Sequence, residues 1–179
     1  MSNGTTALRV GLLGNGAIGR AILRFAADYS TDIQVVGVLS RSGVRDADPP
    51  IVDSVDDLLA LEPSVVVEAA GHGALREHGV AILAHGCDLI ALSVGALADH
   101  ELQRRMSDAM AASGARLRIA SGAIGALDAI GAAAIGGLTS VVHTTRKPAG
   151  SLMSHDEAAA LPEPREIFVG PAREAALLF

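Results

Sequence analysis

Over residues 8–120, short runs of aliphatic residues alternate with longer Ala- and Leu-rich segments of helical period. The strand pattern falls on Leu8–Leu13, Ile33–Leu39, Ile51–Val52, Val65–Ala69, Leu89–Ser93 and Leu117–Ala120. The helical pattern falls on Ala17–Tyr29, Leu75–His85 and Asp99–Ser113. A further short helix is predicted to begin after Ser54, which would be its N-cap. The strand runs are continuously apolar, which is typical of strands buried on both faces. Because right-handed crossovers join such units, the sequence predicts an α/β fold with a doubly wound parallel sheet.

The pattern changes after about residue 121. Residues 121–137, "SGAIGALDAIGAAAIGG", indicate a helix of small residues. The segments "LTSVVHTTRKP" (138–148) and "REIFVGPA" (165–172) predict two strands, and the polar connection carries Pro148, Pro162 and Pro164. We therefore place a first domain at residues 1–121 and the start of a second, α+β domain at residues 122–179.

Composition restricts the partners that the chain can have. The 179 residues are 50% hydrophobic and 19% charged, which suits one packed domain or one domain plus part of a second. A net charge of −6 without a Lys/Arg-rich run argues against a nucleic-acid partner. The N-terminus has no signal-peptide pattern, and the longest uncharged stretch, Ala129–Thr145, is too short and broken to span a membrane. The single cysteine, Cys87, suits a reducing compartment, so we expect a cytoplasmic protein with no nucleic-acid or membrane partner.

The stretch "VGLLGNGAIGRAIL" (Val10–Leu23) carries glycines in the spacing G-x-G-x-x-G between a predicted strand and a predicted helix. This context is what the dinucleotide fingerprint of Rossmann-type folds requires. Gly14 permits the tight turn, Gly16 lets the backbone approach a pyrophosphate, and Gly19 lets the helix lie close to the strand. The alternative is a glycine-rich turn that needs no ligand. We predict a dinucleotide site whose first contacts are Gly14, Asn15, Gly16, Ala17, Ile18 and Gly19.

The end of the second predicted strand bears on which dinucleotide binds. An NAD site usually offers Asp or Glu there for the ribose 2′-hydroxyl, whereas this chain has Ser40 and Arg41. An arginine matches a 2′-phosphate with several donors, and Ser40 can add a hydrogen bond. The alternative is that Arg41 is a solvated loop charge that stacks on adenine. The pattern favours NADP and leaves NAD open.

Three further loops follow predicted strands at the edge where such sheets bind ligands. They are Ala69–Gly73, Ser93–Asp99 and Ser121–Asp128, all rich in small residues. The first offers Ala70, Gly71 and His72 as cofactor contacts, and His72 is either a ribose contact, a proton carrier or an exposed loop histidine. Ser93 and Asp99 are interpreted as a turn donor and a helix N-cap.

Other reactive side chains receive weaker functional interpretations. His72, His78 and His85 are six and seven positions apart, which does not fit the i, i+4 spacing of a zinc helix. Cys87 has no evident partner base and is interpreted as a buried, inert thiol. Arg146 and Lys147 either bind a substrate carboxylate or form a solvated basic pair.

The motifs "GLLGNGAIG", "EAAGHGALREHG", "LSVGALAD", "SGAIGALDAI" and "TTRKP" together resemble the L-aspartate dehydrogenase family, from about Leu8 to the last residue. The resemblance implies a Rossmann domain followed by an α+β domain that binds substrate and makes much of the dimer contact. It implies a homodimer that interconverts L-aspartate and iminoaspartate, or oxaloacetate plus ammonia, with NAD or NADP. By motif, Gly14–Gly19 would hold the pyrophosphate and Ala123 would contact the cofactor.

The chain departs from the family at its C-terminal end. Members continue past a segment like "AREAALLF" to an Asn-containing stretch and to the histidine regarded as catalytic, whereas this chain ends at Phe179. The resemblance therefore assigns no catalytic residue here, and His72 is the candidate that the chain itself offers. We expect a poor catalyst. The alternatives are a binding or sensing module without turnover and a homoserine- or dipicolinate-type reductase.

Overall fold

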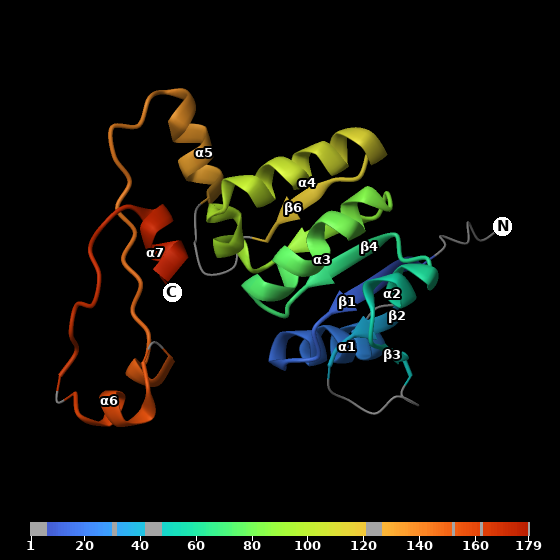
Figure 1. Cartoon of the computed structure of the whole chain (residues 1–179), viewed down its shortest axis with the longest axis horizontal. Coiled ribbons are helices and arrows are strands. Elements are labelled where there is room, and N and C mark those ends of the chain that lie inside the picture. The colour runs from blue at the N-terminus through green and yellow to red at the C-terminus, as the bar shows by residue number, and fades with distance from the viewer. Residues whose placement is uncertain are drawn as a thin grey trace. The chain divides into compact units, whose positions relative to one another are not determined.

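Six parallel strands form one sheet in the first part of the chain, in the order β3-β2-β1-β4-β5-β6 (Figure 1). The computed structural model describes residues 7–29, 32–41, 48–120, 127–151, 153–161 and 163–178. The strands are β1 (Leu8–Leu13), β2 (Ile33–Leu39), β3 (Ile51–Val52), β4 (Val65–Glu68), β5 (Asp88–Ala91) and β6 (Leu117–Ile119). This sheet confirms the predicted doubly wound, Rossmann-type α/β fold.

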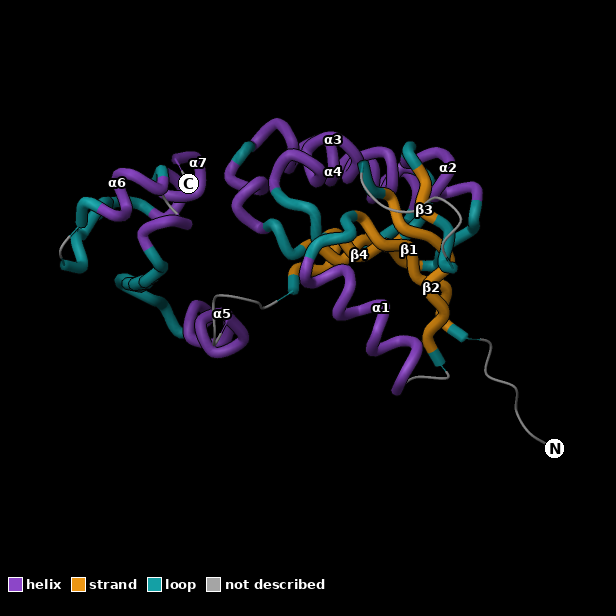
Figure 2. The backbone as a smooth tube through the Cα atoms, turned by 90° about the horizontal axis from the view of Figure 1, so that it is seen from below, coloured by secondary structure: helices purple, strands orange, loops and turns teal. Residues whose placement is uncertain are grey.

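Helices cover both faces of the sheet (Figure 2). Helix α1 (Ala17–Tyr29) lies on one face, whereas α2 (Val55–Ala60), α3 (His72–Ala84) and α4 (His100–Ser113) lie on the other. One core cluster joins the sheet to α1, with Leu12 of β1 and Ile22 of α1 among its members. The cluster on the opposite face includes Leu58, Leu75, Ile82, Leu89 and Met106. Burial on both faces explains why the strand sequences are continuously apolar.

Strand β1 lies at the point where the strand order reverses. From β1 the chain runs outward through β2 to β3, then returns to place β4 on the other side of β1 and continues to β5 and β6. The connections that leave β1 and β4 go to opposite faces of the sheet. Such a reversal opens a crevice at the carboxyl ends of the two central strands, where ligands of doubly wound sheets bind.

Most predicted limits of helices and strands agree with the structure to within a few residues. Helix α3 begins at His72 instead of Leu75, because Gly71 with φ 106° forms the turn before it. His72 therefore belongs to the first turn of a helix and is not a loop residue. Strand β5 ends at Ala91 instead of Ser93, because the next two backbone N–H groups turn towards Glu68. A 3-10 helix, η1 (Val94–Ala98), follows at once and was not predicted.

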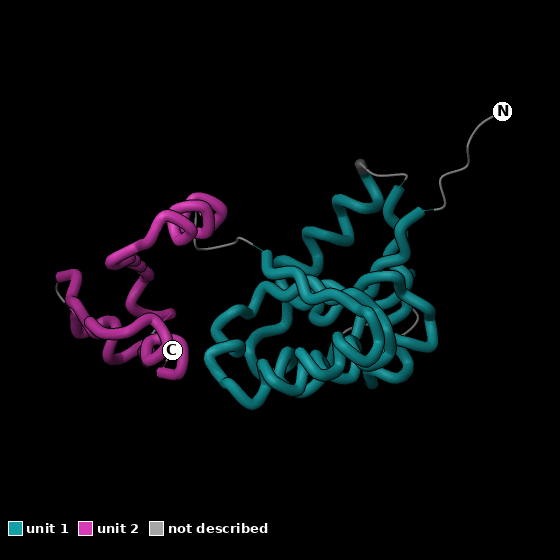
Figure 3. Tube along the Cα trace, turned by 90° about the horizontal axis from the view of Figure 1, so that it is seen from above, with its two compact units in different colours: residues 1–123 teal, residues 124–179 magenta. Residues whose placement is uncertain are grey.

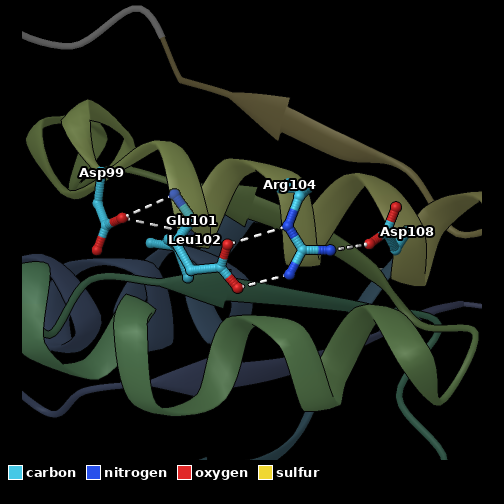
Figure 4. A network of polar contacts seen from close by, with 5 residues as sticks. All are labelled: Asp99, Glu101, Leu102, Arg104 and Asp108. Atoms are coloured by element: carbon cyan, nitrogen blue, oxygen red, sulfur yellow. Dashed lines mark hydrogen bonds and ion pairs between the residues drawn. The ribbon is translucent and has the colours of Figure 1, made fainter.

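Polar side chains fix the start of α4 and pair along its exposed face (Figure 4). The carboxylate of Asp99 accepts hydrogen bonds from the backbone N–H groups of Glu101 and Leu102 at 2.9 and 3.2 Å, as predicted for an N-cap. On the exposed face Arg104 pairs with Glu101 at 2.6 Å and with Asp108 at 2.8 Å. The opposite face contributes the buried side chains Leu102, Met106 and Ala109.

Residues Ile124–Phe179 form a second compact unit, distinct from Met1–Ala123 (Figure 3). Its elements are α5 (Leu127–Ile135), η2 (Ala149–Ser151), α6 (His155–Ala159) and α7 (Ala172–Leu178). The two strands predicted at residues 138–148 and 165–172 are wrong, because the described residues of both segments contain no strand. A strand needs a neighbour for its backbone hydrogen bonds, and the described part of this unit supplies none. Residues 121–126, where the predicted small-residue helix would start, lie outside the described residues.

Candidate functional site

The glycine loop after β1 packs tightly against two other loops. The backbone N–H of Gly14 donates to the carbonyl of Leu39 at 2.9 Å, which ties the loop to the end of β2. Gly14 has φ +110°, and a Cβ there would lie 2.8 Å from the carbonyl oxygen of Ala69. A Cβ at Gly19 would collide with the carbonyl oxygen of Gly14. A larger residue at Gly14 would displace the loop after β4, and one at Gly19 would push α1 away from the glycine loop.

The outward side of the same loop is open. Gly16, Ala17 and Ile18 are exposed, and a Cβ added at Gly16 would meet nothing within 4 Å. The first N–H groups of a helix lack partners within that helix, and the N-terminal end of α1 therefore favours an anion. Arg20 donates to the carbonyl of Asn15 at 2.9 Å, a contact that the sequence pattern did not indicate. The loop thus combines a rigid inner side with an accessible outer side.

The end of β2 places Ser40 and Arg41 beside the glycine loop. The backbone N–H of Ser40 donates to the carbonyl of Val52 at 3.2 Å, which holds this position against β3. Leu39, the residue before Ser40, accepts the hydrogen bond from the Gly14 N–H, so the end of β2 lies next to the glycine loop. Arg41 is exposed, so its guanidinium is accessible to a ligand at this edge. The residues that follow, 42–47, lie outside the described part of the chain.

The start of α3, after β4, lies against η1, after β5. A Cβ at Gly95 would lie 2.5 Å from Cε1 and 2.6 Å from Nε2 of His72, so the imidazole packs directly on the backbone of η1. His72 is partly buried, whereas Ala70 and Gly71 are exposed. The candidate residues of the first loop thus share one edge with the glycine loop, because Ala69 contacts Gly14.

Glu68, the last residue of β4, is a fully buried residue of this edge that the sequence reasoning missed. Its Oε1 accepts from the backbone N–H groups of Ala70 and Gly71 at 2.8 and 2.9 Å and from the hydroxyl of Ser93 at 2.9 Å. Its Oε2 accepts from the N–H groups of Ser93 at 2.9 Å and Leu92 at 3.3 Å. The available signal was an acidic residue closing the apolar run "VVVE", since a carboxylate is seldom buried unless donors surround it.

The remaining predicted site residues belong to the second unit or lie outside the described residues. Ala123, together with the rest of 121–126, lies outside the described residues. Arg146 and Lys147 are exposed and belong to the second unit, on a segment that is not the strand predicted for them. His143 is exposed on the same segment.

Cys87 is buried at the start of β5 and has the character of an unreactive thiol. Its Sγ donates to the carbonyl of Pro63 at 3.3 Å. Burial, together with the neighbouring charge of Asp88, raises the pKa of the Cys87 thiol to about 11. Among the described residues no three His, Cys, Asp or Glu side chains gather as metal ligands. None of the described helices is long and apolar enough to cross a membrane.

Two family models match the chain. Residues 14–120 match the model described as "Homoserine dehydrogenase, NAD binding domain", and residues 128–179 match "Aspartate dehydrogenase, C-terminal". The Rossmann-type sheet, the glycine loop and the first of these matches define the class of protein, a nicotinamide-dependent oxidoreductase.

Relatives of known name narrow this class. The chain is 41% identical to L-aspartate dehydrogenase 1 of Bordetella pertussis over 175 residues, 97% of this chain and 67% of that protein. It is 37% identical to the L-aspartate dehydrogenase of Ralstonia nicotianae, with 96% of this chain and 69% of that protein covered. The chain belongs to the L-aspartate dehydrogenase family, and it spans about two thirds of the length of these relatives.

Solved structures agree with this assignment. The aspartate dehydrogenase of Thermotoga maritima superposes with a TM-score of 0.58 and 26% identity, over 70% of this chain and 50% of that chain. An engineered D-amino acid dehydrogenase bound to NADP+ also gives a TM-score of 0.58, at 22% identity over 73% of this chain and 42% of that chain. This second likeness concerns the fold alone.

Proposed function

We propose that this chain binds NADP or NAD at the carboxyl edge of its sheet and interconverts L-aspartate and iminoaspartate, or oxaloacetate plus ammonia, by hydride transfer. The observation that carries the proposal is the open backbone of Gly16 at the head of α1, set beside the reversal of strand order between β1 and β4. The bound nicotinamide would supply the redox chemistry, and the chain would bind and orient the reactants. The family assignment supports the choice of substrate.

The residues of the edge fit a dinucleotide. A pyrophosphate needs close approach to backbone N–H groups, and the space over Gly16 permits it. Because Gly14 and Gly19 carry no Cβ, which would collide with neighbouring backbone, the loop can adopt the compact form that presents those groups. Ala17 and Ile18 add exposed backbone and apolar surface beside it. Asn15 would donate its backbone N–H to the pyrophosphate. Its carbonyl already accepts a hydrogen bond from the Arg20 side chain.

Arg41 supports a preference for NADP. Its exposed guanidinium, one residue beyond Ser40 at the end of β2, can pair with a 2′-phosphate. Replacing both residues, Ser40→Asp with Arg41→Ala, would remove this charge-assisted contact and add a repulsive one. We expect the ratio of NADP to NAD affinity to fall by about 100-fold. An unchanged ratio in calorimetric titrations would remove Arg41 from the site.

We propose His72 as the acid/base group of this edge, because its imidazole packs on η1 beside the loop after β4. Glu68 is engaged by five donors, and Asp99 caps α4. His72 would contact the ribose or carry a proton during imine hydrolysis. The two carboxylates of aspartate need cationic or N–H donors, and Arg146 and Lys147 are the basic pair that we propose for them.

The experiment that tests cofactor binding compares two glycine variants. A valine side chain at Gly16 would fill the space proposed for the pyrophosphate, so Gly16→Val should weaken NADPH binding by at least about tenfold. Gly131→Val is the matched control, because a Cβ there also meets nothing within 4 Å and the residue lies on α5. Equal NADPH affinity of wild type and folded Gly16→Val would contradict the proposal.

A cofactor-binding module without turnover is the second candidate function. It is favoured by the engagement of Glu68 with five donors and by the N-cap role of Asp99, which leave neither carboxylate free for proton transfer. Consumption of NADPH with oxaloacetate and ammonia separates the two candidates. Turnover that His72→Ala abolishes supports the enzyme, whereas binding without turnover supports the module.

The oligomeric state and location belong to the same proposal. We expect a cytoplasmic homodimer whose contacts come from residues 122–179, the part proposed as the start of the substrate and dimerisation domain. Large apolar side chains of this part, among them Ile135, Val142 and Val169, are strongly exposed and suit an interface. Sedimentation at several concentrations tests the dimer, and a monomer at all of them would contradict it.

A further inference from the structure

Glu68 is a buried charge for which the proposed reaction has no direct use. The residue has 0% exposure, and every group within hydrogen-bonding distance of its two oxygens is a donor. None of the ion pairs between described residues involves this carboxylate. Four backbone N–H groups and one hydroxyl therefore compensate its negative charge. A carboxylate suits this position because it accepts hydrogen bonds at both oxygens and donates none.

The five donors come from two different loops. Ala70 and Gly71 belong to the loop after β4, and Leu92 and Ser93 belong to the loop after β5. These loops are 21 or more residues apart along the chain, and they meet here because Glu68 pairs with Ala91 in the parallel ladder of β4 and β5. The carboxylate thus joins two loops of the carboxyl edge.

The same carboxylate also acts on the glycine loop. Because peptide bonds are planar and trans, the N–H of Ala70 and the carbonyl of Ala69 point in opposite directions. Glu68 draws the Ala70 N–H inwards, and the Ala69 carbonyl is then directed at Gly14, where its oxygen would lie 2.8 Å from an added Cβ. The packing of the glycine loop therefore depends on the orientation of one peptide that Glu68 holds.

We propose that Glu68 is a positioning residue for the dinucleotide: its buried carboxylate fixes the loops after β4 and β5 and, through Ala69, the glycine loop. This inference rests on the proposed function, because the loops matter as a set only if a cofactor binds across them. It assigns no proton transfer to Glu68 and no contact with the cofactor. The residue acts by holding the backbone that makes those contacts.

The first test is Glu68→Gln, which keeps size and shape but places an NH2 group among donors. We expect the dissociation constant for NADPH or NADH, whichever wild type binds more tightly, to rise by about tenfold or more. Amide hydrogen exchange should accelerate at Ala70, Gly71 and Ser93 in the same variant without ligand. A folded Glu68→Gln with wild-type affinity would overturn the positioning role, and unchanged exchange at these amides would overturn the loop connection itself.

A matched pair of serine variants separates positioning from stability. Ser93→Ala removes a hydroxyl that donates to Glu68. Ser113→Ala removes the hydroxyl at the end of α4 that lies 2.6 Å from the carbonyl oxygen of Leu83, on α3, and 2.8 Å from that of Ala109. Both should lower the melting temperature, but only Ser93→Ala should weaken cofactor binding, by several-fold. Equal affinities of the two variants would overturn the proposal even if Glu68→Gln does not fold.

If wild type binds neither NADPH nor NADH, the proposed function fails, and the exchange measurement still decides whether Glu68 connects the loops. If wild type binds and Glu68→Gln binds equally well, the proposed function stands and the positioning role fails. The two failures are therefore distinguishable.

Discussion

The two compact units of the chain differ in what covers their apolar side chains. In the first unit, Leu89 of β5 and Leu75 of α3 are 0% exposed, and every buried core residue of the described chain lies between Val10 and Ala115. In the second unit no described residue is buried, and Val142 is 89% exposed. The amino-acid composition does not explain this contrast, since α5, "LDAIGAAAI", has Asp128 as its one charged residue and yet has no buried residue. The difference is whether another helix or strand packs against the apolar side chains.

The first unit supplies its own partners because each crossover returns the chain to a sheet. Strands β4 and β5 are each followed by a helix that packs on the sheet, so the helix buries apolar side chains of the strands. In the second unit the described residues form helices and no strand. Helix α6 even carries a complete capping box, in which Ser154 and Glu157 exchange hydrogen bonds, yet none of its residues is buried. Local capping defines where a helix begins but does not create a core.

The largest expected difference between the units is in amide hydrogen exchange. Amides of β1, β4 and β5 should exchange only on global unfolding, whereas those of α5 and α7 should exchange through local opening, at least about 10³-fold faster. Slow exchange in α5 or α7 would contradict the comparison. If that slow exchange disappears on dilution, a second copy of the chain covers the second unit.

Truncating one leucine in each unit should separate them by stability. Leu89→Ala removes a fully buried side chain from the cluster under α3 and α4 and should lower the free energy of unfolding by about 2–5 kcal/mol. Leu177→Ala, at a side chain that is 60% exposed, should change it by less than about 0.5 kcal/mol. Denaturant titrations of both variants measure this, and a large cost at Leu177 would show that the second unit has a core.

Helix caps offer the same comparison on a smaller scale. Asp99→Ala removes the acceptor for two N–H groups at the head of α4 and should lower the free energy of unfolding by about 0.5–2 kcal/mol. Ser154→Ala removes the cap of α6 and should leave the main transition unchanged, because no residue of α6 is buried. Equal shifts in the two denaturation midpoints would mean that both units unfold together.

The features that could be predicted from the sequence are those encoded by neighbouring residues. The limits of β1 and α1 follow from an apolar run that ends at spaced glycines, and the role of Asp99 follows from its place before a helical pattern. The strand predictions in the second unit failed because β-branched composition favours extension but does not supply a partner. Gly16 was recognisable from the motif, whereas Glu68 was marked only as an acidic residue that closes an apolar run. Its donors Leu92 and Ser93 are reached only through the pairing of β4 with β5, which no local pattern encodes.

The smallest expected effect is the acid dependence of one ion pair in the first unit. The Asp88 carboxylate accepts from the Arg116 guanidinium at 2.7 and 3.0 Å and from the Arg116 backbone N–H at 2.9 Å, which joins β5 to the start of β6. These hydrogen bonds hold the pKa of Asp88 below its ordinary value of 3.8. Because the folded pKa is the lower one, the ionised carboxylate stabilises the fold above the unfolded pKa, and this contribution is lost as the pH falls through the folded pKa.

Asp88→Asn should therefore lower the free energy of unfolding by roughly 0.2–1 kcal/mol near neutral pH and flatten its decline in acid. The matched control is Glu157, whose pKa is also lowered, by the hydroxyl and backbone of Ser154. Glu157→Gln should leave the acid decline unchanged, because α6 contributes no buried side chain to a cooperative core. Urea titrations across the acid range measure both variants. If Glu157→Gln alters the acid decline as much as Asp88→Asn, the second unit shares the cooperative unfolding of the first, and the contrast in burial does not extend to stability.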